Sequence, residues 1–171
     1  SGKAGEEIEI GWTGPDYRND FIGVRSPDST GFHRFINSSR TSDGSPLRLL
    51  MPSAPGNYLI EYIVAQDRVP LAAWSIDVTP VTAAVVAPAT AVAGSSIEVG
   101  WTGPDYANDF IAIRKPSATG YHRFSHRTRT ERGMPLQLRM PDEPGTYLIE
   151  YIEGQDRTPL AVEEITVTPG G

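Results

Sequence analysis

Apolar and polar residues alternate in short segments along this chain, and glycine or proline separates one segment from the next. Ile8, Ile10 and Trp12 alternate with polar or small residues, which is the period of a strand with one buried face. We predict further strands over residues 21–24, 31–35, 47–51, 58–63 and 76–78. No stretch has helical periodicity longer than two turns. Short strands at this spacing indicate a β-sandwich or barrel.

The pattern occurs twice. The segment Trp-Thr-Gly-Pro-Asp-Tyr at 12–17 returns at 101–106, which is 89 residues later. The offset holds without insertion, and residues 5–80 and 94–169 are identical at 47 of 76 positions. Two copies this similar must share one fold, so we predict two tandem domains, residues 1–80 and 81–171.

The connection between the copies is apolar and lacks the Gly/Ser or charge runs of a flexible linker. We predict that residues 83–87 form the opening strand of the second copy, with Pro88 suited to an edge strand. Only four residues precede Gly5 in the first copy. We therefore expect its opening strand to be absent, which would leave a sheet edge open to another chain.

A Pro-Gly corner followed by tyrosine closes each copy. Tyr58 and Tyr147 each follow Pro-Gly and one further residue, and each opens a predicted strand. This arrangement is that of the tyrosine corner, in which the hydroxyl bonds the backbone a few residues upstream. The alternative is that these tyrosines are ordinary core residues. With Trp12 and Trp101 on an early strand, the pattern predicts an all-β chain of two immunoglobulin-like, fibronectin type III-like sandwiches.

Four segments carry a resemblance to a known family. They are Gly-Trp-Thr-Gly-Pro-Asp-Tyr (11–17), Asp-Phe-Ile (20–22), Pro-Leu-x-Leu-x-Met-Pro (46–52) and Pro-Gly-x-Tyr-Leu-Ile-Glu-Tyr (55–62). They resemble repeats of bacterial von Willebrand factor A-domain proteins, and residues 20–24 also resemble a strand of the immunoglobulin-like SKICH domains. The resemblance implies the fold and no activity. The A domain itself, with its metal-binding Asp-x-Ser-x-Ser loop, is absent from this sequence.

Charge and composition exclude several classes of function. The net charge is −6, and the two halves contribute equally, with 7 basic and 10 acidic residues in 1–80 and 8 and 11 in 81–171. Such a chain is not expected to bind nucleic acid, which needs clustered Lys and Arg. Without cysteine there is no disulfide or thiolate zinc site. No apolar run approaches the ~20 residues of a membrane helix, so no membrane insertion is expected. Because the chain begins Ser-Gly-Lys, we expect it to belong to a larger protein with further domains.

Polar residues retained in both copies are the candidate binding residues. The loop at 16–20 and the loop at 66–68 should project from the same end of the sandwich, the end that carries the binding loops of antibody variable domains. The candidates there are Asp16, Asp20, Gln66, Asp67 and Arg68, with Asp105, Asp109, Gln155, Asp156 and Arg157 in the second copy. As an alternative, Asp16, Asn19, Asp20 and Asp67 would offer oxygen ligands to Ca²⁺. The other interpretation is that Asp20 and Asp67 satisfy loop amides or pair with arginines.

The most basic stretch of the chain lies in the second copy. It contains His122, Arg123, Arg127 and Arg129 and continues to Arg132, with Glu131 as the one opposing charge. It suits an acidic partner or an anionic polymer. The alternative is a solvated, charged edge strand that discourages aggregation.

Catalytic motifs are missing: there is no Gly-x-Ser-x-Gly elbow, phosphate loop or His-Glu-x-x-His. We therefore predict no enzyme and no cofactor. The preferred hypothesis is a spacer or protein-binding module of a larger bacterial protein, in the periplasm, at the cell surface or secreted. The alternative is a Ca²⁺- or carbohydrate-binding module. For sugar binding the candidate aromatics are Tyr17, Tyr106 and Trp74, and because Trp74 matches Glu163, we expect it near the surface or the domain boundary.

Overall fold

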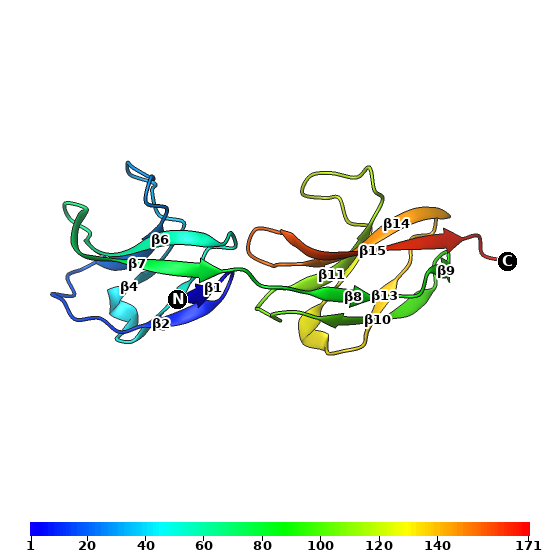
Figure 1. Cartoon of the computed structure of the whole chain (residues 1–171), viewed down its shortest axis with the longest axis horizontal. Helices are drawn as coiled ribbons and strands as arrows, with labels where there is room; N and C mark the ends of the chain where they lie inside the picture. The colour runs from blue at the N-terminus through cyan, green and yellow to red at the C-terminus, as the bar shows by residue number, and fades with distance from the viewer. The chain divides into compact units, whose positions relative to one another are not determined.

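The computed structural model describes all of residues 1–171. The chain divides into two compact units, Ser1–Pro80 and Val81–Gly171, referred to below as domain 1 and domain 2. Each is an all-β, immunoglobulin-like sandwich of two sheets (Figure 1). No helix has the length and apolar character required to cross a membrane.

Domain 1 has a five-stranded sheet in the order β1-β7-β6-β3-β4 and a two-stranded sheet of β2 and β5. All pairings are antiparallel except that of β1 with β7, which is parallel. The strands are β1 (Gly2–Lys3), β2 (Glu7–Ile10), β3 (Phe21–Arg25), β4 (Asn37–Arg40), β5 (Leu47–Leu50), β6 (Gly56–Val64) and β7 (Val69–Thr79), and the 3₁₀ turn η1 (Thr41–Asp43) joins β4 to β5.

Domain 2 repeats this plan and adds one strand. Its sheets have the orders β12-β11-β14-β15-β9 and β13-β10-β8. The strands are β8 (Ala84–Val86), β9 (Thr90–Val92), β10 (Ser96–Thr102), β11 (Phe110–Arg114), β12 (His126–Arg129), β13 (Leu136–Arg139), β14 (Gly145–Ile152) and β15 (Pro159–Thr168), with the 3₁₀ turn η2 (Thr130–Arg132) between β12 and β13.

The core of each domain follows from the alternation in the sequence. In β14, Tyr147, Ile149 and Tyr151 are all buried and face the buried side chains of β10 and β13. Burial of an aliphatic side chain such as that of Ile149 contributes roughly 1.5–3 kcal/mol. Val99 and Leu138 complete the contact from the opposite sheet.

Two aromatic contacts close each sandwich. The Tyr58 hydroxyl donates to the Ala54 carbonyl at 2.8 Å, four residues upstream, which is the geometry of a tyrosine corner. Tyr147 does the same to Glu143 at 2.9 Å. The Trp12 ring is half-buried against Tyr62, with ring centroids 5.6 Å apart, and Trp101 repeats this contact in domain 2.

The two domains differ in their opening strands. Within the predicted 83–87 strand, β8 pairs with Gly100–Thr102 of β10, and the described residues of domain 1 hold no counterpart of β8. Domain 1 nevertheless has β1, the counterpart of β9, in parallel pairing with β7. Because β9 lies outside the predicted 83–87 strand, β1 does not contradict the expected absence of that strand from domain 1, which stays a prediction. Where β8 is missing, Gly11–Thr13 lie outside any strand.

The predicted strand at 31–35 is wrong. These residues belong to the loop between β3 and β4, and the strand begins at Asn37. Gly31 has a positive φ of 83°, which turns the chain. Phe35 then packs back over β3, where a Cβ at Gly23 would lie 2.5 Å from its ring. The aromatic residues of this segment cover the outer face of the sheet instead of alternating across it.

Candidate functional site

The two predicted end loops of domain 1 are joined by one buried carboxylate. Asp20 is 1% exposed. Its Oδ2 accepts from the Tyr17 amide and from the Tyr62 hydroxyl, both at 3.0 Å, and its Oδ1 accepts from the Ala65 amide at 3.0 Å. These bonds tie the 16–20 loop to the loop after β6, so the loops do share one end of the sandwich.

Asp109 makes the same three bonds in domain 2. It accepts from the Tyr106 amide at 3.0 Å, the Tyr151 hydroxyl at 2.7 Å and the Gly154 amide at 2.9 Å. Three donors occupy most of the acceptor positions of a buried carboxylate and offset the loss of its hydration. Asp20 and Asp109 are therefore structural residues that organise the loops.

The four residues of the alternative Ca²⁺ site do not form a cation site. Asp20 is committed to its three donors, and Asp16 Oδ1 accepts from the Thr41 hydroxyl at 2.6 Å. Asn19 and Asp67 are exposed. No three His, Cys, Asp or Glu side chains group in a way that would hold a metal ion.

Burial raises the pKa of the Tyr62 and Tyr151 phenols. Desolvation is the largest cause for both, and the hydrogen bonds to Asp20 and Asp109 also favour the protonated form. A folded-state pKa above the unfolded value means that the folded state holds its proton more tightly. The resulting stabilisation is present below the unfolded pKa, about 10, and is lost as the pH rises above it.

We expect the urea midpoint of domain 2 to fall steeply above about pH 10, where the Tyr151 phenol ionises only after unfolding. Tyr151→Phe should make this decline shallower, because phenylalanine has no proton to lose. Equal slopes for the two proteins between pH 8 and about pH 11 would contradict the buried, protonated phenol.

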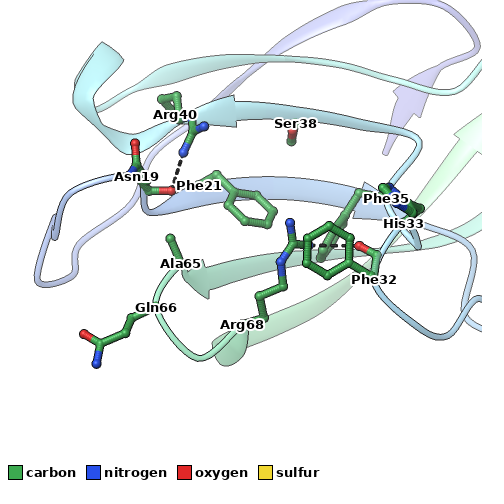
Figure 2. Close-up of a pocket in the computed structure, with 10 residues that line it drawn as sticks. All are labelled: Asn19, Phe21, Phe32, His33, Phe35, Ser38, Arg40, Ala65, Gln66 and Arg68. Atoms are coloured by element: carbon green, nitrogen blue, oxygen red, sulfur yellow. Dashed lines mark hydrogen bonds between the residues drawn. The ribbon is translucent and has the colours of Figure 1, made fainter.

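An arginine stacks on an aromatic ring over the outer face of each five-stranded sheet. In domain 1 the Arg68 guanidinium lies 3.6 Å from the centroid of the Phe32 ring and donates to the Phe32 carbonyl at 2.9 Å (Figure 2). In domain 2 Arg157 lies 3.6 Å from the Tyr121 ring and donates to its carbonyl at 2.7 Å. Both arginines have positive φ, so the turn after β6 or β14 directs them back over the sheet.

The stacked arginine of domain 1 borders a hollow of about 640 Å³. Phe21 forms its floor, and Arg40 lies at one end with a hydrogen bond to the Asn19 carbonyl at 2.6 Å (Figure 2). Figure 2 also shows the Gln66 side chain pointing away from Phe21. The hollow lies between the sheet and the loop that was predicted as a strand.

Domain 2 has two adjoining hollows on the corresponding face, of about 480 and 490 Å³. They share Tyr121, Arg127 and Arg157. We call the surface they form the cationic groove and define it by its basic residues. These are His122, His126, Arg127, Arg129, Arg132 and Arg157.

A charged pair lies under the same loop. Arg114 Nε and Nη2 donate to the two Glu150 oxygens at 3.1 and 2.9 Å, and the Glu150 side chain is 3% exposed. Arg114 Nη1 donates to the carbonyls of Lys115, Pro116 and Ala118. The pair thus fixes the start of the loop that carries Tyr121.

The structure disperses the remaining predicted residues. Asp105, Asp67 and Asp156 are exposed on the end loops, and Asp156 accepts from the Thr158 amide and hydroxyl. Gln155 donates its amide to buried Glu153. None of these enters the cationic groove.

The basic residues are brought together, but not all on a strand. Arg127 and Arg129 lie on edge strand β12, as the edge-strand interpretation requires. His122 and Arg123 lie on the loop before it, where Arg123 stacks over Phe124 at 4.4 Å and bonds the Arg157 carbonyl.

Sequence reasoning missed the aromatic platforms. Neither Phe32 nor Tyr121 was a candidate, yet each holds an arginine and stays more than 60% exposed. The one sequence feature that could have indicated them is the aromatic residue that precedes His-Arg in both copies. Trp74, by contrast, lies near the surface as expected, at 38% exposed.

The chain is similar to several solved structures. The D0-D1 domain of intimin is 16% identical over 97% of this chain and 93% of that one, with a TM-score of 0.28. The D00-D0 domain of intimin is 12% identical over 98% of this chain and 94% of that one, with a TM-score of 0.30. A marsupial T cell receptor is 13% identical over 98% of this chain and 70% of that one, with a TM-score of 0.31. No protein family model and no curated protein matches the chain. The tandem immunoglobulin-like fold is shown by the sheet topology, and the comparisons assign no partner to it.

Proposed function

We propose that the chain is a non-catalytic, protein-binding pair of immunoglobulin-like domains that also serves as a spacer. The parent would be a larger bacterial protein that is exported or associated with the envelope. The proposal follows from how the duplicated polar residues are used. Asp20, Asp109 and Glu150 serve the fold itself, with their oxygens bonded inside the domains.

The observation that carries the proposal is the outer face of the β12-β11-β14 sheet in domain 2. There Arg157 is stacked on exposed Tyr121, beside Arg127 and Arg129 on the edge strand. Arginine and tyrosine are the residue types enriched at the energetic centres of protein interfaces. Held by its aromatic platform, Arg157 loses little rotamer freedom when a partner binds.

The Ca²⁺- and carbohydrate-binding alternative has less support. Asp20, its central carboxylate, accepts three internal hydrogen bonds. Of the candidate aromatics for sugar, Tyr17 and Trp74 are exposed but come from different segments, the 16–20 loop and β7. No single face carries a row of them.

Site-specific crosslinking in the cells that make the parent protein tests the proposal. We expect p-benzoylphenylalanine at Tyr121, which is 66% exposed, to crosslink one defined protein. The matched control replaces Val86, which is 69% exposed on the other sheet of the same domain. Excess unlabelled chain should abolish the crosslink, and mass spectrometry identifies the adduct.

The proposal is supported if the adduct formed at position 121 is a protein, if excess unlabelled chain abolishes it, and if no such adduct forms at position 86. Crosslinking at neither position, at both positions equally, or to non-protein material would contradict it.

A further inference from the structure

The cationic groove is lined by basic residues that have no carboxylate partner. Arg127, Arg129, Arg132 and Arg157 take part in no ion pair within 4 Å. Their hydrogen bonds go to a carbonyl or an amide: Arg157 to the Tyr121 carbonyl and Arg129 to the Asn108 side chain. No Asp or Glu lines either hollow. In a domain whose net charge is −3, this is a local concentration of positive charge.

The groove is rich in charged hydrogen-bond donors, and its side-chain acceptors, such as those of Asn108, Ser125 and Thr128, include no carboxylate. Guanidinium groups only donate, and their planar fork matches a carboxylate in a two-bond geometry. Neutral sugars present hydroxyls that both donate and accept, so they also need acceptors such as carboxylates in a site. The chemistry of the lining therefore favours a ligand rich in anionic oxygens.

The aromatic rings of the groove already serve the arginines. Arg157 stacks on Tyr121 at 3.6 Å, and Arg127 lies 5.5 Å from the centroid of the Phe110 ring. A ring face that holds a guanidinium is not free to stack on a sugar ring. This favours a polypeptide with acidic side chains over a polysaccharide.

Domain 1 provides an internal comparison. Its hollow keeps the stacked arginine and Arg40, the counterpart of Arg129. At the 89-residue offset, however, Ser38 replaces Arg127 and Asp43 replaces Arg132. Domain 1 thus has the same scaffold without the concentrated charge.

We propose that the cationic groove of domain 2 binds an extended acidic segment of a protein partner, whose Asp or Glu carboxylates pair with Arg127, Arg129, Arg132 and Arg157. This rests on the proposed protein-binding function and names the chemistry of the partner. The two adjoining hollows suit alternate side chains of an extended strand, which point to the same side.

Fluorescence anisotropy with the full chain tests the proposal. The probe is a short labelled peptide of alternating Glu and Ser, and the matched peptide has Gln for Glu. We expect only the Glu peptide to bind, with affinity that falls as salt rises. Arg127→Ser with Arg132→Asp, the residues of domain 1, should weaken binding by about 30-fold or more.

Two further variants separate the site from general charge. Arg139→Asp with Lys115→Gln makes the same change in net charge at exposed positions outside the groove and should leave affinity within about threefold. Ser38→Arg with Asp43→Arg should create a second binding site, this one in domain 1, and raise the number of peptides bound per chain from one to two.

Several outcomes would overturn the acidic-segment assignment: no binding of the Glu peptide, equal loss in both double variants, or binding of a sulfated oligosaccharide or inorganic phosphate in its place. A protein crosslinked at Tyr121 together with no Glu-peptide binding would leave the proposed function standing and refute the chemistry assigned here.

Discussion

Asp109→Ala is expected to destabilise domain 2 by about 3–5 kcal/mol and to leave domain 1 unchanged. The substitution removes the acceptor of the Tyr106 amide, the Tyr151 hydroxyl and the Gly154 amide together. Each buried donor left without a partner costs roughly 1–3 kcal/mol, and partial access of water limits the sum. Urea titration read by hydrogen exchange and mass spectrometry reports the two domains separately.

The control for this prediction is Asp105→Asn. Asp105 is exposed, and its positive φ of 54° is one that asparagine tolerates. We expect a change within about 0.5 kcal/mol. A similar loss in both variants, or a loss below about 1 kcal/mol for Asp109→Ala, would refute the structural role of the buried carboxylate.

Glu150→Gln should destabilise domain 2 by about 3 kcal/mol, because it leaves the Arg114 guanidinium under the loop without its counter-charge. Gln keeps the size of the side chain, so packing changes little. Arg114 also holds three loop carbonyls. We therefore expect residues 115–125 to exchange faster than in the wild type, in the same hydrogen-exchange experiment.

Glu163→Gln is the matched control for the ion pair. Glu163 is exposed on β15, opposite Ile149, and its counterpart in domain 1 is Trp74, so the position tolerates a neutral side chain. Its stability should stay within about 0.5 kcal/mol of wild type. If Glu150→Gln were equally mild, the pair would contribute nothing to the loop.

The sequence was most informative where the side chains alternate. Ile8 and Ile10, Leu47 and Leu49, and the 58–63 segment all lie on observed strands. Their period of two is set by the pleat, so a buried face can be recognised without coordinates. The repeat then extended this reading to the second domain, and the tyrosine corner followed from Pro-Gly before Tyr58.

The pattern failed where side chains pack across a sheet from a loop. Residues 31–35 contain two phenylalanines, which are typical of a strand, but Gly31 turns the chain and Phe35 folds over Gly23. The sequence named Arg68 and Arg157 as candidates but did not reveal that they stack on aromatic rings, for a related reason. Arg157 reaches Tyr121 from 36 positions along the chain, and no local periodicity encodes such a contact.

The candidate end loops share one end of the sandwich as predicted, and Asp20 satisfies loop amides, as one of the two interpretations of the sequence held. Retention of Asp20 and Asp109 in both copies fitted either a binding or a folding role, and both are 1% exposed and bonded to loop amides and a buried tyrosine. Two copies of one chain retain folding residues as strictly as binding residues. The difference between copies, Arg127 and Arg132 against Ser38 and Asp43, was the more informative signal.

Mapping of the NMR chemical shifts of backbone amides in the ¹⁵N-labelled full chain tests most directly whether the acidic peptide binds in the cationic groove of domain 2. On addition of the alternating Glu-Ser peptide, we predict shifts at residues 108, 120–132 and 154–157, and none at residues 16–20. Ca²⁺ alone should shift none of these amides. Peptide shifts spread evenly over both domains, or Ca²⁺-dependent shifts at residues 16–20 and 105–109, would contradict the account.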